Sequence, residues 1–100
     1  MNLTAGLRLR SQVCDTECIV VRAGRATDLR CGGHPMIPFG ETPDDSLATD
    51  PRHAGGTQLG KRYVDADGLE ILVTKAGVGT LSIGSVPLEI KAAKALPASD

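Results

Sequence analysis

Residues 29–36 read Leu29-Arg30-Cys31-Gly32-Gly33-His34-Pro35-Met36, and residues 81–88 read Leu81-Ser82-Ile83-Gly84-Ser85-Val86-Pro87-Leu88. The two stretches align without a gap at a constant offset of 52 residues, from position 29 to position 81. Each has an apolar start, then glycine, which permits the backbone angles of a tight turn, and then proline, which favours an extended chain. The sequence therefore predicts one strand–turn–strand unit twice.

The similarity continues upstream of these stretches. Ala23-Gly24 corresponds to Ala76-Gly77, and the apolar runs 19–21 and 71–73 precede them. Runs of β-branched and aliphatic residues are typical of strands. We therefore expect an internal repeat in an all-β fold: two pseudo-symmetric units of short antiparallel strands, packed as a small barrel or sandwich. Neither unit is large enough to bury a core alone, so the two should pack against each other.

The apolar/polar alternation and the turn residues divide the chain into segments. Strands are expected at residues 7–13, 18–23, 29–31, 61–64, 69–74, 80–83 and 86–90. We expect a single domain over residues 1–100, with a first β-unit at 7–38, a linker loop at 39–59, a second β-unit at 60–91 and a tail at 92–100. The loop is polar and rich in glycine and proline, which predicts a mobile segment with His53 in solvent. A helical turn at 92–95 should end before Pro97.

Composition excludes several classes of function. The chain has a net charge of −1, one Phe, one Tyr and no Trp. It therefore lacks the positive charge and the aromatic stacking platforms of nucleic-acid-binding proteins. No apolar run is long enough to cross a bilayer, and the first residues do not resemble a signal peptide. The chain has three cysteines, an odd number that cannot all form disulfides with one another. We therefore expect a cytoplasmic protein with reduced thiols or metal-bound cysteines.

Four residues have the spacing of a small metal site. Cys14 and Cys18 form Cys-x3-Cys, and Cys31 and His34 form Cys-x2-His across the glycine turn. A Cys3His set suits tetrahedral zinc, with Glu17 as an alternative oxygen ligand. Cys18 also opens an apolar strand, where a free cysteine packs as a small hydrophobe. Zinc or iron binding and a metal-free site both remain open, and the metal-free site is the favoured alternative.

These motifs together resemble those of desulforedoxin and of the N-terminal domain of desulfoferrodoxin. The resemblance covers residues 12–38, and 63–90 more loosely, and rests on Cys14, the Ala-Gly step and the Cys-Gly-x-x-Pro-Met element that begins at Cys31. It implies a small β-domain that pairs by twofold symmetry and holds iron through four cysteines, two as C-x-x-C and two adjacent. Two units in one chain would resemble a fused form of that dimer.

The chain departs from the family at the metal ligands. Glu17 stands where the second cysteine is expected, with Cys18 one position late, and Gly32 replaces the cysteine adjacent to Cys31. The second unit contains no cysteine. The family's electron-transfer centre is therefore not carried over to this chain.

The expected function follows from these points. We expect a small, non-catalytic accessory or binding protein that acts through a protein partner, either a larger enzyme or a second copy, on a desulforedoxin-like scaffold with a degenerate metal site. The alternative is a rubredoxin-type metalloprotein that binds zinc or iron through Cys14, Cys18, Cys31 and His34. Cys31 with His34 as base could supply a nucleophile across the turn, but a deep pocket is not expected in so small a β-domain. No catalytic residue is assigned.

Overall fold

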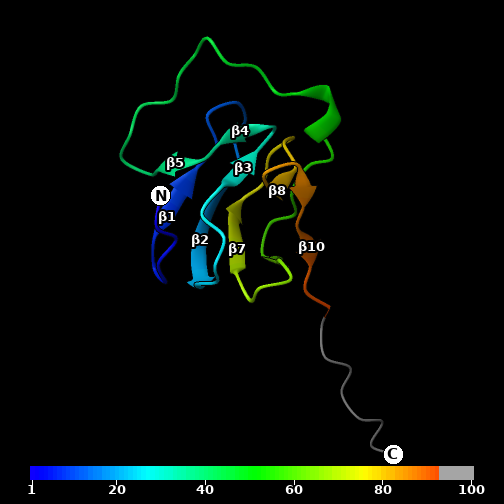
Figure 1. Ribbon diagram of the computed structural model, residues 1–100. Coiled ribbons are helices and arrows are strands. Elements are labelled where there is room, and N and C mark those ends of the chain that lie inside the picture. Colours follow the sequence, from blue (N-terminus) through cyan, green and yellow to red (C-terminus); the bar gives the residue numbers. More distant parts are fainter. Residues whose placement is uncertain (93–100) are drawn as a thin grey trace, which may run out of the picture.

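The computed structural model describes residues 1–92, and they form two antiparallel sheets (Figure 1). The six-stranded sheet has the order β10 (Glu89–Ile90), β6 (Arg62–Val64), β7 (Glu70–Lys75), β2 (Glu17–Arg22), β1 (Arg8–Arg10), β5 (Ile37–Pro38). The four-stranded sheet has the order β4 (His34–Pro35), β3 (Leu29–Cys31), β8 (Leu81–Ile83), β9 (Val86–Pro87). The expected all-β class with sandwich-like packing is confirmed, and neither sheet closes into a barrel.

The two units are pseudo-symmetric in their strand register. Each strand from β1 to β5 has a counterpart five numbers higher, from β6 to β10. Replacing every strand by its counterpart gives the same order for each sheet, read in the opposite direction. The central pairs are Arg30 opposite Ser82, 52 positions apart, and Ile19 opposite Leu72, 53 positions apart. These separations equal the sequence offsets at the same places, so equivalent residues of the two units face each other across an approximate twofold axis.

The turn between β3 and β4 has the geometry that its two glycines allow. Cys31 pairs with His34, which leaves Gly32 and Gly33 as the two central residues. Their φ angles are 65° and 85°. Two consecutive positive φ angles are typical of a type I′ hairpin turn, which matches the twist of the flanking strands. The glycine pair thus places Cys31 and His34 opposite each other on neighbouring strands.

Met36 and Leu88 mark where the chain passes from one sheet to the other. Met36 lies between β4 and β5, and Leu88 lies between β9 and β10. Each is buried, and their amides donate equivalent hydrogen bonds to the carbonyls of Leu29 and Leu81, at 3.1 and 2.9 Å. The expectation of one strand over residues 86–90 is therefore wrong, because Leu88 turns into the core and interrupts it.

One hydrophobic core fills the space between the sheets. Many of its members are equivalent residues of the two units, such as Cys18 and Ile71, or Val20 and Val73. Tyr63 is the only aromatic residue of this core, and its hydroxyl accepts a hydrogen bond from the Gln58 amide at 2.9 Å. Aliphatic side chains supply almost all of the rest, as the composition predicts.

The connection between the units packs against both of them. In Figure 1 it arches in green from β5 past β4 to η1 (Pro51–His53). The Asp50 amide donates to the Gly32 carbonyl at 2.9 Å, and the Thr80 amide donates to the His53 carbonyl at 2.8 Å. Backbone hydrogen bonds therefore attach the segment that the sequence predicts as a mobile linker, although it buries few apolar side chains. His53 is half-buried rather than solvent-exposed.

The described chain ends directly after β10. The expected helical turn at 92–95 lies almost wholly outside the described residues. Within residues 1–92, no helix has the length and apolar character of a membrane span.

Candidate functional site

The sulfur atoms of Cys14 and Cys31 lie 3.7 Å apart. Cys14 belongs to the connection between β1 and β2, and Cys31 ends β3 in the other sheet. The pair is backed by the turn after β7, where a Cβ added at Gly77 would lie 3.0 Å from the Cys14 sulfur and one at Gly79 would lie 2.9 Å from that of Cys31. The absence of a side chain at these glycines leaves the space that the two sulfurs occupy.

Polar neighbours favour the thiolate form of Cys14. The hydrogen bond with Cys31 lowers the pKa of Cys14 most, and the hydroxyls of Ser11 and Thr16, each 3.3 Å from its sulfur, lower it further. The pKa of Cys31 is raised, first by its hydrogen bond to Cys14 and then by its own burial. Of the two sulfurs, the opposite directions of these pKa shifts favour the thiolate on Cys14 and the protonated thiol on Cys31.

Cys18 lies in the core, away from this pair. It is 2% exposed, and its sulfur contacts the Met36 sulfur at 3.9 Å. Burial raises the pKa of Cys18 to about 12. Its counterpart in the second unit is Ile71, a fully buried residue, so this position is an apolar core site in both units.

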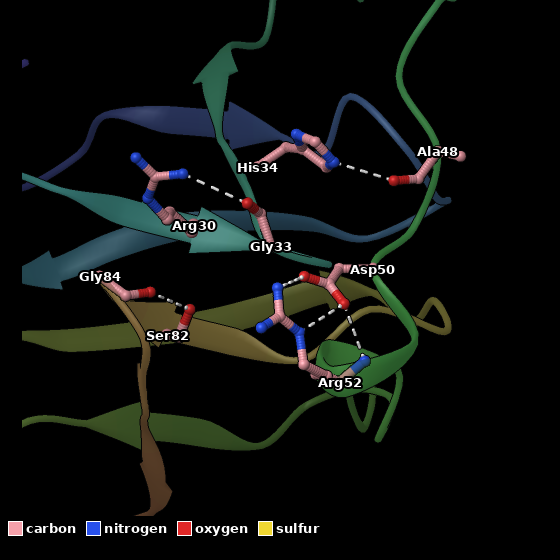
Figure 2. Close-up of polar contacts among 8 residues, drawn as sticks. All are labelled: Arg30, Gly33, His34, Ala48, Asp50, Arg52, Ser82 and Gly84. Atoms are coloured by element: carbon pink, nitrogen blue, oxygen red, sulfur yellow. Dashed lines mark hydrogen bonds and ion pairs between the residues drawn. The ribbon is translucent and has the colours of Figure 1, made fainter.

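His34 also points away from the sulfur pair. Figure 2 shows its ring beside the connecting segment, with Nε2 2.9 Å from the Ala48 carbonyl. The backbone of β4 pairs His34 with Cys31, but this hydrogen bond turns the imidazole toward residues 48–50. The structure thus brings together two of the four predicted ligands, Cys14 and Cys31, and holds the other two elsewhere.

The residues present fit half of a tetrahedral metal site. A sulfur separation of 3.7 Å matches the value of about 3.8 Å that Zn–S bonds of about 2.3 Å require in a tetrahedron. Glu17 lines the same small hollow as Cys14. Within residues 1–92, however, no three side chains of His, Cys, Asp or Glu converge on one point. A Cys3His centre does not fit this arrangement.

A charged hollow of about 310 Å³ lies between η1 and the four-stranded sheet. Arg30 on β3 and Arg52 on η1 line it, and each is paired with its own aspartate; Figure 2 shows the pair of Arg52 with Asp50. Arg30 Nε is 3.0 Å from Asp28, and Arg52 Nη2 is 2.9 Å from Asp50. The charges cancel pairwise, so the hollow has no net charge that would select an anion.

An apolar groove of about 260 Å³ lies beside β9, in the second unit. It is lined by Val64, Asp65, Ala66, Ile83, Val86, Pro87, Leu88 and Glu89. Val86 is 68% exposed and Ile90 is 41% exposed, which is high for aliphatic residues of strands. The sequence does not predict this groove. Residues 86–90 have the pattern of a single strand, in which Val86 and Leu88 would lie on the same face, whereas the structure exposes Val86 and buries Leu88.

Family models, curated proteins and solved structures were all compared with this chain, and none matched.

Proposed function

We propose that this protein is a small, non-catalytic accessory protein that holds an extended segment of a protein partner in the groove beside β9. The observation that carries the proposal is a difference between the two pseudo-equivalent edges of the four-stranded sheet. Both β4 and β9 end this sheet, but among the described residues 1–92 a chain segment covers the β4 edge and none covers the β9 edge.

The cover over the first unit shows how a chain segment fits there. Gln12 Nε2 donates to the Pro35 carbonyl at 2.8 Å, and Thr49 Oγ1 donates to the Val13 carbonyl at 3.2 Å. Residues 12–16 and 48–50 thus occupy the region that corresponds to the open groove of the second unit. A partner segment placed along β9 would take the same position, in the manner of strand addition to a sheet edge.

The lining predicts the chemistry of the occupant. Six of the eight lining residues are apolar, and the other two are the carboxylates Asp65 and Glu89. The volume suits one or two large side chains. We therefore expect an extended peptide with an apolar anchor and a neighbouring lysine or arginine, which the two carboxylates would attract.

Three further parts of the proposal rest on separate observations. The shared register supports an internal repeat that arose by duplication, on a scaffold that resembles a fused desulforedoxin dimer. The three free cysteines support a reducing location such as the cytoplasm. The sulfur spacing of Cys14 and Cys31 keeps the rubredoxin-type alternative as a second candidate, in which zinc or iron needs ligands beyond this pair.

Selection from a library of short random peptides displayed on phage tests the groove. Enriched peptides should share an apolar residue beside a basic one, and Val86→Lys should weaken their binding by about tenfold or more. Val78→Lys is the matched control, because Val78 is 61% exposed in the turn after β7, outside the groove. The control should bind as the wild type does.

Three results would contradict the proposal. They are enrichment without a shared pattern, equal loss of binding in both variants, and a stable dimer that buries β9 in sedimentation experiments. The dimer would make a second copy the occupant, and its loss in Val86→Lys but not in Val78→Lys would establish this.

A further inference from the structure

The cysteine pair next to the β1–β2 connection has properties that partner binding does not use. Cys14 is half-buried and lines a surface hollow of about 50 Å³, whereas Cys31 is fully buried behind it. A reagent that enters this hollow from solvent therefore meets Cys14, because Cys31 has no exposed surface and does not line the hollow.

The hollow does not select strongly for charge. Its rim carries the cations of Arg10 and Lys75 and the carboxylates of Asp15 and Glu17. It is also too small for more than one slender arm of a molecule. A short, unbranched reagent that carries its reactive atom near the end fits these limits.

We propose that Cys14 and Cys31 form a redox-active dithiol that is oxidised by small organic disulfides, with Cys14 as the attacking thiol and Cys31 as the resolving thiol. Their sulfurs need to approach from 3.7 Å to about 2.05 Å to form the bond. Cys14 lies in a bend between β1 and β2 that the Ser11 amide closes by donating to the Thr16 carbonyl at 2.9 Å, whereas Cys31 is paired within β3, so we expect the bend to adjust when the bond forms.

The exchange balances without a further reactant. The Cys14 thiolate attacks one sulfur of the small disulfide, whose S–S bond breaks and releases one thiolate. This leaving group takes up the proton of Cys31. The Cys31 thiolate then attacks the Cys14 sulfur of the mixed disulfide and releases the second small thiolate, which takes up the proton that Cys14 gave to solvent. The two cysteines lose two hydrogens, and the small disulfide gains them.

Closing the bond has a structural consequence. It joins residues 17 positions apart and ties the β1–β2 connection to β3, at the covered edge of the four-stranded sheet. The oxidised protein should therefore melt at a higher temperature than the reduced one, because the cross-link restricts the unfolded chain.

The test uses the full chain, reduced and treated with a chelator to remove any bound metal, and bis(2-hydroxyethyl) disulfide as the oxidant. Intact mass should fall by two hydrogens, and peptide mapping should join Cys14 to Cys31. Cys31→Ser should stop at a mixed disulfide on Cys14, and Cys14→Ser should not react. Cys18, buried in the same molecule, is the internal control and should stay unmodified.

Other outcomes overturn the inference. They are a bond that includes Cys18, a stable adduct on Cys14 in the wild type, and no reaction of the folded chain under conditions that oxidise the urea-unfolded chain. The wild-type mapping decides the question even if a cysteine variant fails to fold.

Discussion

Replacing Gly79 by alanine tests how closely the turn after β7 packs on the first unit. The added Cβ would lie 2.8 Å from the Gly32 amide nitrogen, 2.9 Å from the Cys31 sulfur and 3.0 Å from the Gly32 Cα. Two of these three atoms belong to the backbone of the glycine turn, so a side-chain rotation cannot relieve the overlap. The turn or the hairpin has to shift.

The expected cost is that of overpacking a dense site, about 1–3 kcal/mol. For a domain of about this size, each kcal/mol lowers Tm by about 4–8 °C, so Gly79→Ala should melt roughly 5–20 °C below the wild type. Urea unfolding should show a lower midpoint with an unchanged slope, since the surface exposed on unfolding stays the same.

Gly40→Ala is the matched control, because a Cβ at Gly40 would have no atom within 4 Å. It should leave Tm unchanged or raise it slightly, since alanine restricts the unfolded chain. Equal Tm values for the two variants would show that the β7–β8 turn does not press on the Gly32–Gly33 turn, and would refute the packing described for the cysteine pair.

Three further predictions follow from single contacts. The lowered pKa of Glu70, caused first by Lys91 and then by Arg62, means that its contribution to stability is complete above the ordinary carboxyl pKa and is lost as pH falls through the lowered value. Glu70→Gln should therefore lower Tm at pH 7, and this difference should shrink in acid; a constant difference would contradict the ion-pair account. Thr49→Val removes the hydrogen bond to the Val13 carbonyl and should cost about 1 kcal/mol in urea unfolding, and no change would mean that the segment is not attached there. Iodoacetamide at pH 7 should label Cys14 in the folded protein and leave Cys18 unlabelled, whereas equal labelling would place Cys18 at the surface.

Most of the strand pattern could be predicted because it depends on local signals. Alternation, β-branched runs and glycine turns predicted most of the paired strands. The constant offset predicted two equivalent units, but not that equivalent residues such as Arg30 and Ser82 would pair directly. Strand ends were less predictable: the chain leaves the sheet after Arg10, and Leu88 breaks the expected final strand. Both depend on where the chain changes sheets, which is a tertiary property.

The candidate site was predictable only in part. Side chains alternate between the two faces of a strand, so the sequence already allowed Cys18 in β2 to point into the core. Its counterpart Ile71 is also fully buried, which shows that this is an apolar core position in both units. The orientation of His34 depends on the Ala48 carbonyl, in a segment whose sequence has no periodic pattern. Composition indicates how much apolar surface such a segment can bury, but not which backbone groups it pairs.

The difference between the two units has a physical origin in their connections. In the first unit, residues 12–16 are long enough to bring Cys14 over Cys31, and the long segment after β5 closes over them. In the second unit the β6–β7 connection (residues 65–69) is one residue shorter than the β1–β2 connection (residues 11–16), and no segment within residues 1–92 returns over β9, so Val86 stays exposed. An exactly symmetric chain would have two covered edges or two open ones. The same scaffold thus provides a sheltered thiol pair at one edge and an open groove at the other, and substitutions at Val86 and at Cys31 should affect the two independently.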